Sequence, residues 1–124
     1  MRTIKFKAKR LDNREWVKGD LVHSTSYVGI SYPSDEFPDV PIVQRVDPET
    51  VCMFTGLKDC DGNEIYEGDI IDFDICLCSV VWVDGVCAFC LKNTTLETSG
   101  TTPLGVMLDY YNKHKVLGSI YDSK

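Results

Sequence analysis

The stretch that decides the fold is MFTGLKDCDGNEIYEGDII, residues 53–71, in which charged and turn-forming residues separate two apolar ends. Asp61-Gly62 is typical of a tight turn whose residues take positive φ angles. Ile65 and Tyr66 offer apolar anchors after that turn, and Gly68-Asp69 can bend the chain into the next strand. The stretch therefore predicts a structural hairpin that leads into a core strand beginning near Asp69.

A calcium loop and a catalytic carboxylate pair are the chemical alternatives for this stretch. An EF-hand loop starting at Asp59 needs glycine at its sixth position and glutamate at its twelfth, where the sequence has Glu64 and Ile70. Glu64 with Glu67 or Asp69 could divide acid and base roles as in a glycosidase. The sequence reveals no apolar pocket beside them that would raise a carboxyl pKa, so we expect ordinary, exposed carboxylates.

Alternation of apolar and polar residues predicts short strands along the rest of the chain. The first two, with a turn at 12–14 between them, would form an opening hairpin whose lysines face water. Asp84-Gly85 predicts a two-residue hairpin turn between two later strands. The predicted strands are 3–9, 15–22, 26–32, 41–46, 70–77, 79–83, 86–91 and 116–121.

Loops and one helix complete the predicted fold. Residues 33–41 hold three prolines and three acids and predict a mobile excursion, and 93–103 predicts a second loop. Asp47 can cap a single helical turn that starts at Pro48, and 104–111 fits a short helix or a strand. We therefore predict an all-β fold of short antiparallel strands, an SH3-like barrel or a sandwich, with room for one short helix.

Length and charge limit the organisation and the partners. The 124 residues predict one domain, 1–124, which could divide into an N-terminal lobe, 1–50, and a barrel-like C-terminal lobe, 51–124. Residues 1–18 hold seven basic residues and two acids, a charge of 7 − 2 = +5, and the remainder holds six and seventeen, a charge of 6 − 17 = −11. Because excess carboxylates repel phosphate, packing of the basic end against an acidic surface is favoured over nucleic-acid binding.

The cysteines suit a reducing compartment. No run is long and apolar enough to span a bilayer, and the N-terminus has no signal-peptide core, so we expect a cytoplasmic protein with reduced thiols. On strands Cys76 and Cys78 would share a face, whereas Cys87 and Cys90 would point to opposite faces, which disfavours a four-thiolate zinc site. We expect no metal, no cofactor and no disulfide. The six cysteines are at positions 52, 60, 76, 78, 87 and 90.

The residue identities and spacing of the central stretch resemble those of a known protein family. Thr55-Gly56-Leu57-Lys58-Asp59, then Gly62, then Glu64-Ile65-Tyr66-Glu67-Gly68-Asp69-Ile70 looks like the signature of the YopX family of temperate phages and prophages. Glu15-Trp16-Val17, Pro48-Glu49-Thr50-Val51 and 116–121 also resemble family positions, so the resemblance covers nearly the whole chain. It differs at the end, where family members commonly continue with an Asn-Pro-containing tail. The resemblance implies a largely β fold, a phage origin and self-association, and it brings no established activity or catalytic residues.

Three functions are compatible with these observations. The favoured hypothesis is a phage accessory protein that forms homo-oligomers and binds an unidentified phage or host protein. A nucleic-acid-binding regulator would rely on the basic opening hairpin and Trp16. An enzyme would need the acidic loop, or a cysteine with His23 or His114, and neither pattern predicts a catalytic set. The excursion from Ser34 to Pro41 is one candidate interaction surface. The other comprises Gly56, Lys58, Asp59, Asp61, Glu64, Tyr66, Glu67 and Gly68.

Overall fold

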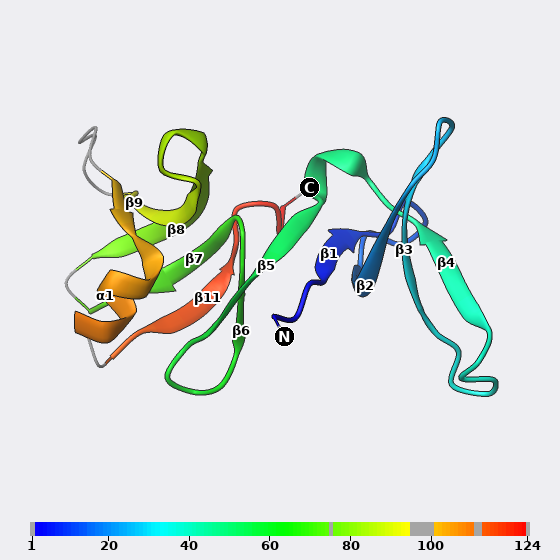
Figure 1. Cartoon of the computed structure of the whole chain (residues 1–124), viewed down its shortest axis with the longest axis horizontal. Helices are drawn as coiled ribbons and strands as arrows, with labels where there is room; N and C mark the ends of the chain where they lie inside the picture. The colour runs from blue at the N-terminus through cyan, green and yellow to red at the C-terminus, as the bar shows by residue number, and fades with distance from the viewer. Residues whose placement is uncertain (1, 75, 95–100, 111–112, 124) are drawn as a thin grey trace. The chain divides into compact units, whose positions relative to one another are not determined.

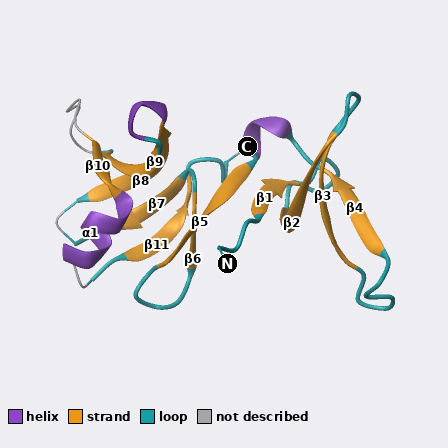
Figure 2. Cartoon of the chain, viewed as in Figure 1, coloured by secondary structure: helices purple, strands orange, loops and turns teal. Residues whose placement is uncertain are grey.

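The structure is a computed structural model that describes residues 2–74, 76–94, 101–110 and 113–123. The chain divides into two compact units: the first ends at Phe54, and the second runs from Thr55 to Ser123. Figure 1 labels the elements, and Figure 2 shows that most of them are strands. We describe each unit by itself.

The first unit is an antiparallel sheet in which neighbours in the sequence pair in order. Its strands follow the spatial order β4-β3-β2-β1, and the beginning of β5 pairs with β1 (Figure 1). Hairpin connections of this kind are the simplest way to join short antiparallel strands. The elements are β1 (Phe6–Lys9), β2 (Trp16–His23), β3 (Val28–Pro33), β4 (Pro41–Arg45), the 3-10 turn η1 (Pro48–Thr50) and β5 (Cys52–Lys58).

A small apolar core holds the first unit together. Ala8, Ile30 and Val46 are buried at its centre. The predicted helical turn is confirmed: Asp47 Oδ1 accepts a hydrogen bond from Glu49 N, and Pro48 occupies the first position of η1. The same turn is tied to β1, because Lys9 N donates to Thr50 Oγ1 at 2.9 Å.

The prediction that the β1 lysines face water is wrong for Lys9. This residue is only 5% exposed, because the β1–β2 register places it opposite Trp16. Its Nζ lies 5.6 Å from the centroid of the indole, and Lys7 Nζ lies 4.5 Å from it. Lys5 Nζ similarly lies 5.1 Å from the centroid of the Phe54 ring. The alkyl stems therefore cover aromatic rings, and the cations gain cation–π contacts.

The second unit contains a five-stranded antiparallel sheet and the one α-helix of the described residues. The strand order is β10-β9-β8-β7-β11, and the later part of β5 is followed by β6. Helix α1 contacts β9 and β10 (Figure 2). The elements are β6 (Glu64–Tyr66), β7 (Asp69–Asp72), β8 (Leu77–Val83), the 3-10 turn η2 (Asp84–Val86), β9 (Ala88–Asn93), β10 (Thr101–Pro103), α1 (Leu104–Tyr110) and β11 (Lys115–Ser119).

The larger hydrophobic core lies in this second unit. Alternate residues of β7, β8 and β9 supply one buried face, as strand geometry requires. Leu104 closes that face from α1, with Met107 and Leu108 packed beside it. The helical alternative for 104–111 is therefore confirmed over 104–110. The buried cluster contains Ile65, Ile71, Phe73, Cys78, Val80, Leu91 and Leu104.

Three predicted boundaries in the second unit need correction. The 70–77 strand stops at Asp72, because Asp74 takes a positive φ of 69° and Phe73 N donates to Cys76 O. The hairpin at Asp84-Gly85 exists, but its connection is a 3-10 turn followed by Cys87 at a φ of 51°. The predicted loop 93–103 contains β10 at its end, and positions 95–100 lie outside the described residues.

The predicted fold class is confirmed: the protein is mostly antiparallel β-structure in two sheets with one short helix. Among the described residues neither sheet closes into a barrel. The first sheet curls toward closure at one corner, where Arg10 bridges Val46 and Leu11 N donates to Arg45 O at 3.2 Å. Right-handed sheet twist favours such curling. The bridge involves only Val46, so residues 41–44 of β4 remain an open edge of the sheet.

Candidate functional site

The predicted hairpin at 53–71 is organised by the carboxylate of Asp59. This side chain is 6% exposed and lies in the turn between β5 and β6. Oδ1 accepts hydrogen bonds from Asp61 N at 3.0 Å and Asn63 N at 2.8 Å. Oδ2 accepts from Asn63 Nδ2 at 3.2 Å and from Val116 N in β11 at 3.0 Å. Asp59 therefore ties the turn to a strand that follows it by 57 residues.

These hydrogen bonds decide the charge state and the role of Asp59. Burial alone would raise its pKa, but the amide donors, with Val116 N first among them, lower it below the ordinary value. Both carboxylate oxygens already accept N–H groups, so they are poorly placed to hold a calcium ion. The turn itself differs from the prediction in one respect: Gly62 has a positive φ of 85°, whereas Asp61 does not have a positive φ.

The second half of the stretch is also structural. Asp69 is 1% exposed and accepts a hydrogen bond from Tyr66 N at 2.8 Å, so the predicted strand start at Asp69 is confirmed. Gly68 has a φ of 84°, and its amide donates to Val80 O. A Cβ at Gly68 would lie 2.9 Å from Cε2 of Tyr121. Glycine is required here by both conformation and space.

The eight predicted contact residues divide into a buried set and an accessible set. Asp59 and Tyr66 are 6% and 1% exposed, and Gly68 is also buried, so these three cannot offer side chains to a partner. Glu64 and Glu67 are half-buried. Within the predicted surface the accessible residues are therefore Gly56, Lys58, Asp61, Glu64 and Glu67.

Glu67 lies at a shallow depression of about 170 Å³ that sequence reasoning did not anticipate. Trp82 forms part of its wall and is 45% exposed. The indole is fixed by a 2.7 Å hydrogen bond to Asp84 Oδ1 and by an edge contact with Phe89. Partial burial raises the pKa of Glu67, contrary to the expectation of an ordinary carboxylate. Residues 80–82 and 120–121 complete the depression.

Replacing Glu67 by glutamine is expected to stabilise the protein at neutral pH. The folded-state pKa of Glu67 is raised, so its ionised form is less favourable in the folded protein than in the unfolded chain. At neutral pH, ionised Glu67 therefore lowers the free energy of unfolding. The gain should be present at pH 7 and should vanish below about pH 4, where the carboxyl is protonated in both states. Urea unfolding at both pH values tests this, with the exposed Glu36→Gln as the control. Equal stability of Glu67→Gln and wild type at pH 7 would contradict it.

A second depression, of about 400 Å³, lies between the turn that joins β5 to β6 and the segment before β11. Cys60 Sγ donates a hydrogen bond to His114 O at 2.8 Å. The His114 side chain is 8% exposed and lies against Phe73, with ring centroids 6.0 Å apart. His114 therefore contacts the Cys60 thiol through its backbone. The remaining lining residues are Asp72, Asp74, Lys113 and Lys115, whose formal charges balance.

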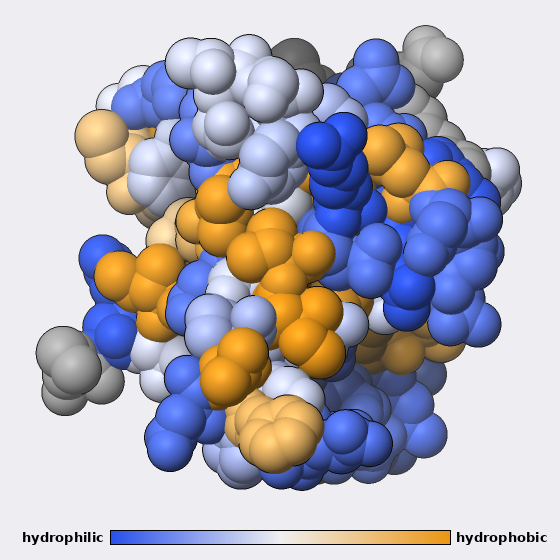
Figure 3. Space-filling view, turned by 90° about the vertical axis from the view of Figure 1, so that its right-hand side faces the viewer, coloured by the Kyte–Doolittle hydropathy of each residue, from blue (hydrophilic) through white to orange (hydrophobic). Residues whose placement is uncertain are grey.

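The excursion and β4 together form an apolar surface, which we name the β4 surface. The excursion is closed by hydrogen bonds from Ser34 N to Val40 O and from Val40 N to Phe37 O. The β4 surface comprises Phe37, Val40, Ile42 and Val43, whose exposed fractions are 64%, 58%, 39% and 44%. Figure 3 shows hydrophobic side chains gathered on this side of the molecule. Consecutive Ile42 and Val43 point to opposite faces of the sheet, so the β4 surface extends around the strand edge onto both faces.

Two further questions concern groups of metal ligands and membrane-spanning helices. Among the described residues, no three His, Cys, Asp or Glu side chains are grouped so that they could hold a metal ion. Within the same part of the chain, no helix has the length and apolar character needed to cross a bilayer.

Comparison with known proteins assigns the family. The crystal structure of protein EF1440 from Enterococcus faecalis is similar, with a TM-score of 0.59 and 19% sequence identity. The match covers 99% of this chain and 96% of that chain, and at this identity it shows the fold alone. No curated protein matches the chain. The family model described as YopX protein matches residues 5–124, and the chain therefore belongs to the YopX family.

Proposed function

We propose that this protein is a non-enzymatic accessory protein of a temperate phage or prophage, acting in the cytoplasm of the bacterial host. It works as a homo-oligomeric binding module and contacts a phage or host protein. Membership of the YopX family supports the phage origin through the resemblance already described. The observation that carries the binding role is the exposed β4 surface beside an open strand edge.

A second copy of the chain is the occupant that best fits the β4 surface. Exposed apolar side chains next to an open edge strand are a typical site of strand or side-chain association. The surface has acids at one end, Asp35, Glu36 and Asp39, and Arg45 at the other. In a two-fold arrangement of antiparallel edges, the acidic end of each copy meets the basic end of its partner. Charge and apolar contact therefore favour the same self-complementary pairing.

The non-enzymatic part of the proposal is supported by the use of the polar side chains. Asp59 and Asp69, the buried acids of the family stretch, accept backbone N–H groups. The Cys60 thiol donates to a carbonyl of His114. These contacts maintain the fold. Trp16, on which the alternative nucleic-acid hypothesis relied, lies beneath Lys7 and Lys9, which reduces its availability for base stacking.

Light scattering over a range of protein and salt concentrations tests the self-association. We expect a mass that rises with concentration from 14.0 kDa toward twice that value. Val40→Lys should raise the dissociation constant at least about tenfold, because it places a charge in the apolar contact. The matched control is Val86→Lys, since Val86 is 60% exposed and Val40 is 58% exposed.

Three results would overturn this proposal in distinguishable ways. A monomer under every condition would refute self-association. Equal weakening by Val40→Lys and Val86→Lys would show that the β4 surface is not the contact. Tight, sequence-selective DNA binding would instead support the regulator, and its affinity should then fall steeply with added salt.

A further inference from the structure

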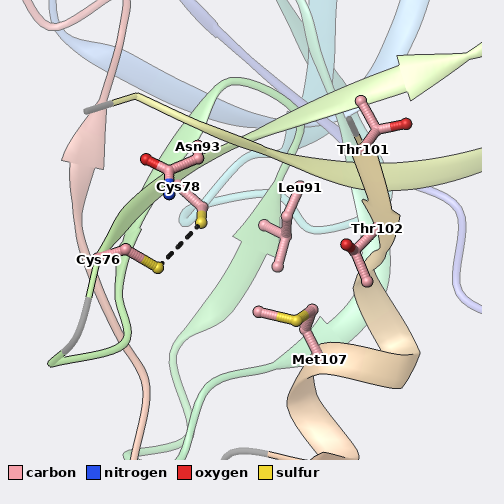
Figure 4. A pocket seen from close by; sticks show the side chains of 7 residues that line it. All are labelled: Cys76, Cys78, Leu91, Asn93, Thr101, Thr102 and Met107. Atoms are coloured by element: carbon pink, nitrogen blue, oxygen red, sulfur yellow. Dashed lines mark hydrogen bonds between the residues drawn. The ribbon is translucent and has the colours of Figure 1, made fainter. Parts of the chain in front are cut away.

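Two thiols and a thioether line one depression at the margin of the second unit's core. Cys78 belongs to β8, and Cys76 precedes that strand by one residue. As predicted for residues two apart, their side chains share a face, and the two Sγ atoms are 3.7 Å apart. Figure 4 shows both thiols beside the depression, with Met107 extending into it from α1. The depression has a volume of about 300 Å³.

We propose that Cys76, Cys78 and Met107 form a binding site for a soft monovalent metal ion of the Cu(I) type. The two cysteines bind it as thiolates, and the Met107 thioether supplies the third ligand. Thiolates and thioethers are the side chains that select soft ions. The site is independent of the β4 surface and of self-association.

The sulfur geometry supports coordination by three ligands. With metal–sulfur distances of about 2.3 Å, sulfurs 3.7 Å apart subtend an angle of about 107° at the ion. This angle is far from the linear arrangement of a two-coordinate ion, so a third donor is needed to complete the shell. Met107 is the candidate for that donor, because it lines the same depression and packs against the core cluster that contains Cys78.

The ligand set also discriminates between metals. Calcium and magnesium require several oxygen ligands, which a dithiol does not provide. Structural zinc requires four ligands, and the described residues contain no group of three His, Cys, Asp or Glu side chains suited to a metal. The sequence argument against a four-thiolate zinc site does not extend to an ion that needs only two thiolates and a thioether.

Binding exchanges two protons for the ion. A thiol must lose its proton to become a thiolate ligand, and burial raises the pKa of the Cys78 thiol to about 12. One Cu(I) and two thiols give a bis-thiolate complex and two released protons, with no change of oxidation state. Affinity should therefore rise with pH, by at most about 100-fold per unit.

The test titrates reduced protein anaerobically with Cu(I) against a chromophoric Cu(I) chelator. A parent variant carrying Cys60→Ser and Cys87→Ser removes the two exposed cysteines. We expect this parent to take one Cu(I) per chain, with a sulfur-only shell in X-ray absorption. Adding Cys76→Ser should weaken binding at least about 100-fold, because one of two thiolates is lost. Met107→Leu should weaken it about tenfold, and Met53→Leu, a half-buried methionine of β5, should have no effect.

Circular dichroism of each metal-free variant separates loss of the site from loss of the fold. Cys76 is half-exposed, so its replacement by serine should be tolerated. Should that variant unfold, Met107→Leu against Met53→Leu still decides the outcome. Cu(I) affinity that is unchanged by Cys76→Ser or Met107→Leu would overturn the proposal, and so would a preference for zinc over Cu(I).

Discussion

Replacing Asp59 by alanine is expected to lower the free energy of unfolding by about 4 kcal/mol. The carboxylate accepts hydrogen bonds from four donors among the described residues. Alanine cannot accept any of them, so the amides of Asn63 and Val116 lose charged acceptors in a partly buried position. A buried donor without an acceptor costs about 1–3 kcal/mol, and these costs fall on one turn.

Chemical denaturation measures this loss, and Asp61→Ala is the matched control. Asp61 lies in the same turn and is exposed, and its Oδ2 is 3.9 Å from Lys115 Nζ. Removing this exposed pair should change stability by less than about 0.5 kcal/mol. Hydrogen exchange adds a local readout, since the Val116 amide should exchange faster in Asp59→Ala alone. Similar losses for both variants would show that the Asp59 network is unimportant.

The pH dependence of the same network has a defined sign. The folded-state pKa of Asp59 is lowered, so its contribution is present above the unfolded-state pKa and is lost as pH falls through the folded value. The stability gap between wild type and Asp59→Asn should therefore be constant near neutral pH and shrink below about pH 4. Glu67 shows the opposite dependence, because its pKa is raised.

Local patterns predict the strands well because each strand carries its own periodicity. The alternation at 3–9 predicts β1, and the β-branched run at 79–83 predicts most of β8. The same patterns fail where a distant residue decides burial. Lys9 is buried because the β2 register brings Trp16 over the same face. That register is a property of the folded sheet, which alternation within β1 cannot reveal.

The candidate sites were less predictable than the strands, because their partners come from distant segments. Asp59 lies in the predicted hairpin stretch, but its hydrogen bond from Val116 N joins residues 57 positions apart in the sequence. The pattern at 41–46 predicts a strand, but it does not reveal that Ile42 and Val43 are 39% and 44% exposed. The Cys76–Cys78 pair was predictable from the spacing of two, which places side chains on one face of an extended chain, although Cys76 lies just before β8. Met107 could be added only once α1 was placed against the sheet.

The segments Lys18-Gly19-Asp20 and Glu67-Gly68-Asp69 both contain a Gly-Asp pair, but glycine is required in each for a different structural reason. Gly68 is required by a positive φ of 84° and by the Tyr121 ring. Gly19 is required by a neighbouring backbone: a Cβ there would lie 2.2 Å from Ser31 O in β3. The same dipeptide therefore reflects backbone conformation and a ring contact at Gly68, and close approach of a neighbouring strand at Gly19.

Gly19→Ala is expected to destabilise the first unit by about 3 kcal/mol, because β2 and β3 would have to separate. The obstructing Ser31 O is backbone, and the next nearest atom, Ile30 Cγ2, belongs to a fully buried side chain at 3.1 Å. Neither can move without disturbing the pairing of Asp20 with Ser31 and of Leu21 with Ile30. The control is Gly85→Ala, where a Cβ meets nothing within 4 Å and stability should change by less than about 0.5 kcal/mol. Denaturation curves for the two variants decide the matter: equal midpoints would mean that the strands part easily, and a lower midpoint for Gly19→Ala alone would locate the constraint at the β2–β3 contact.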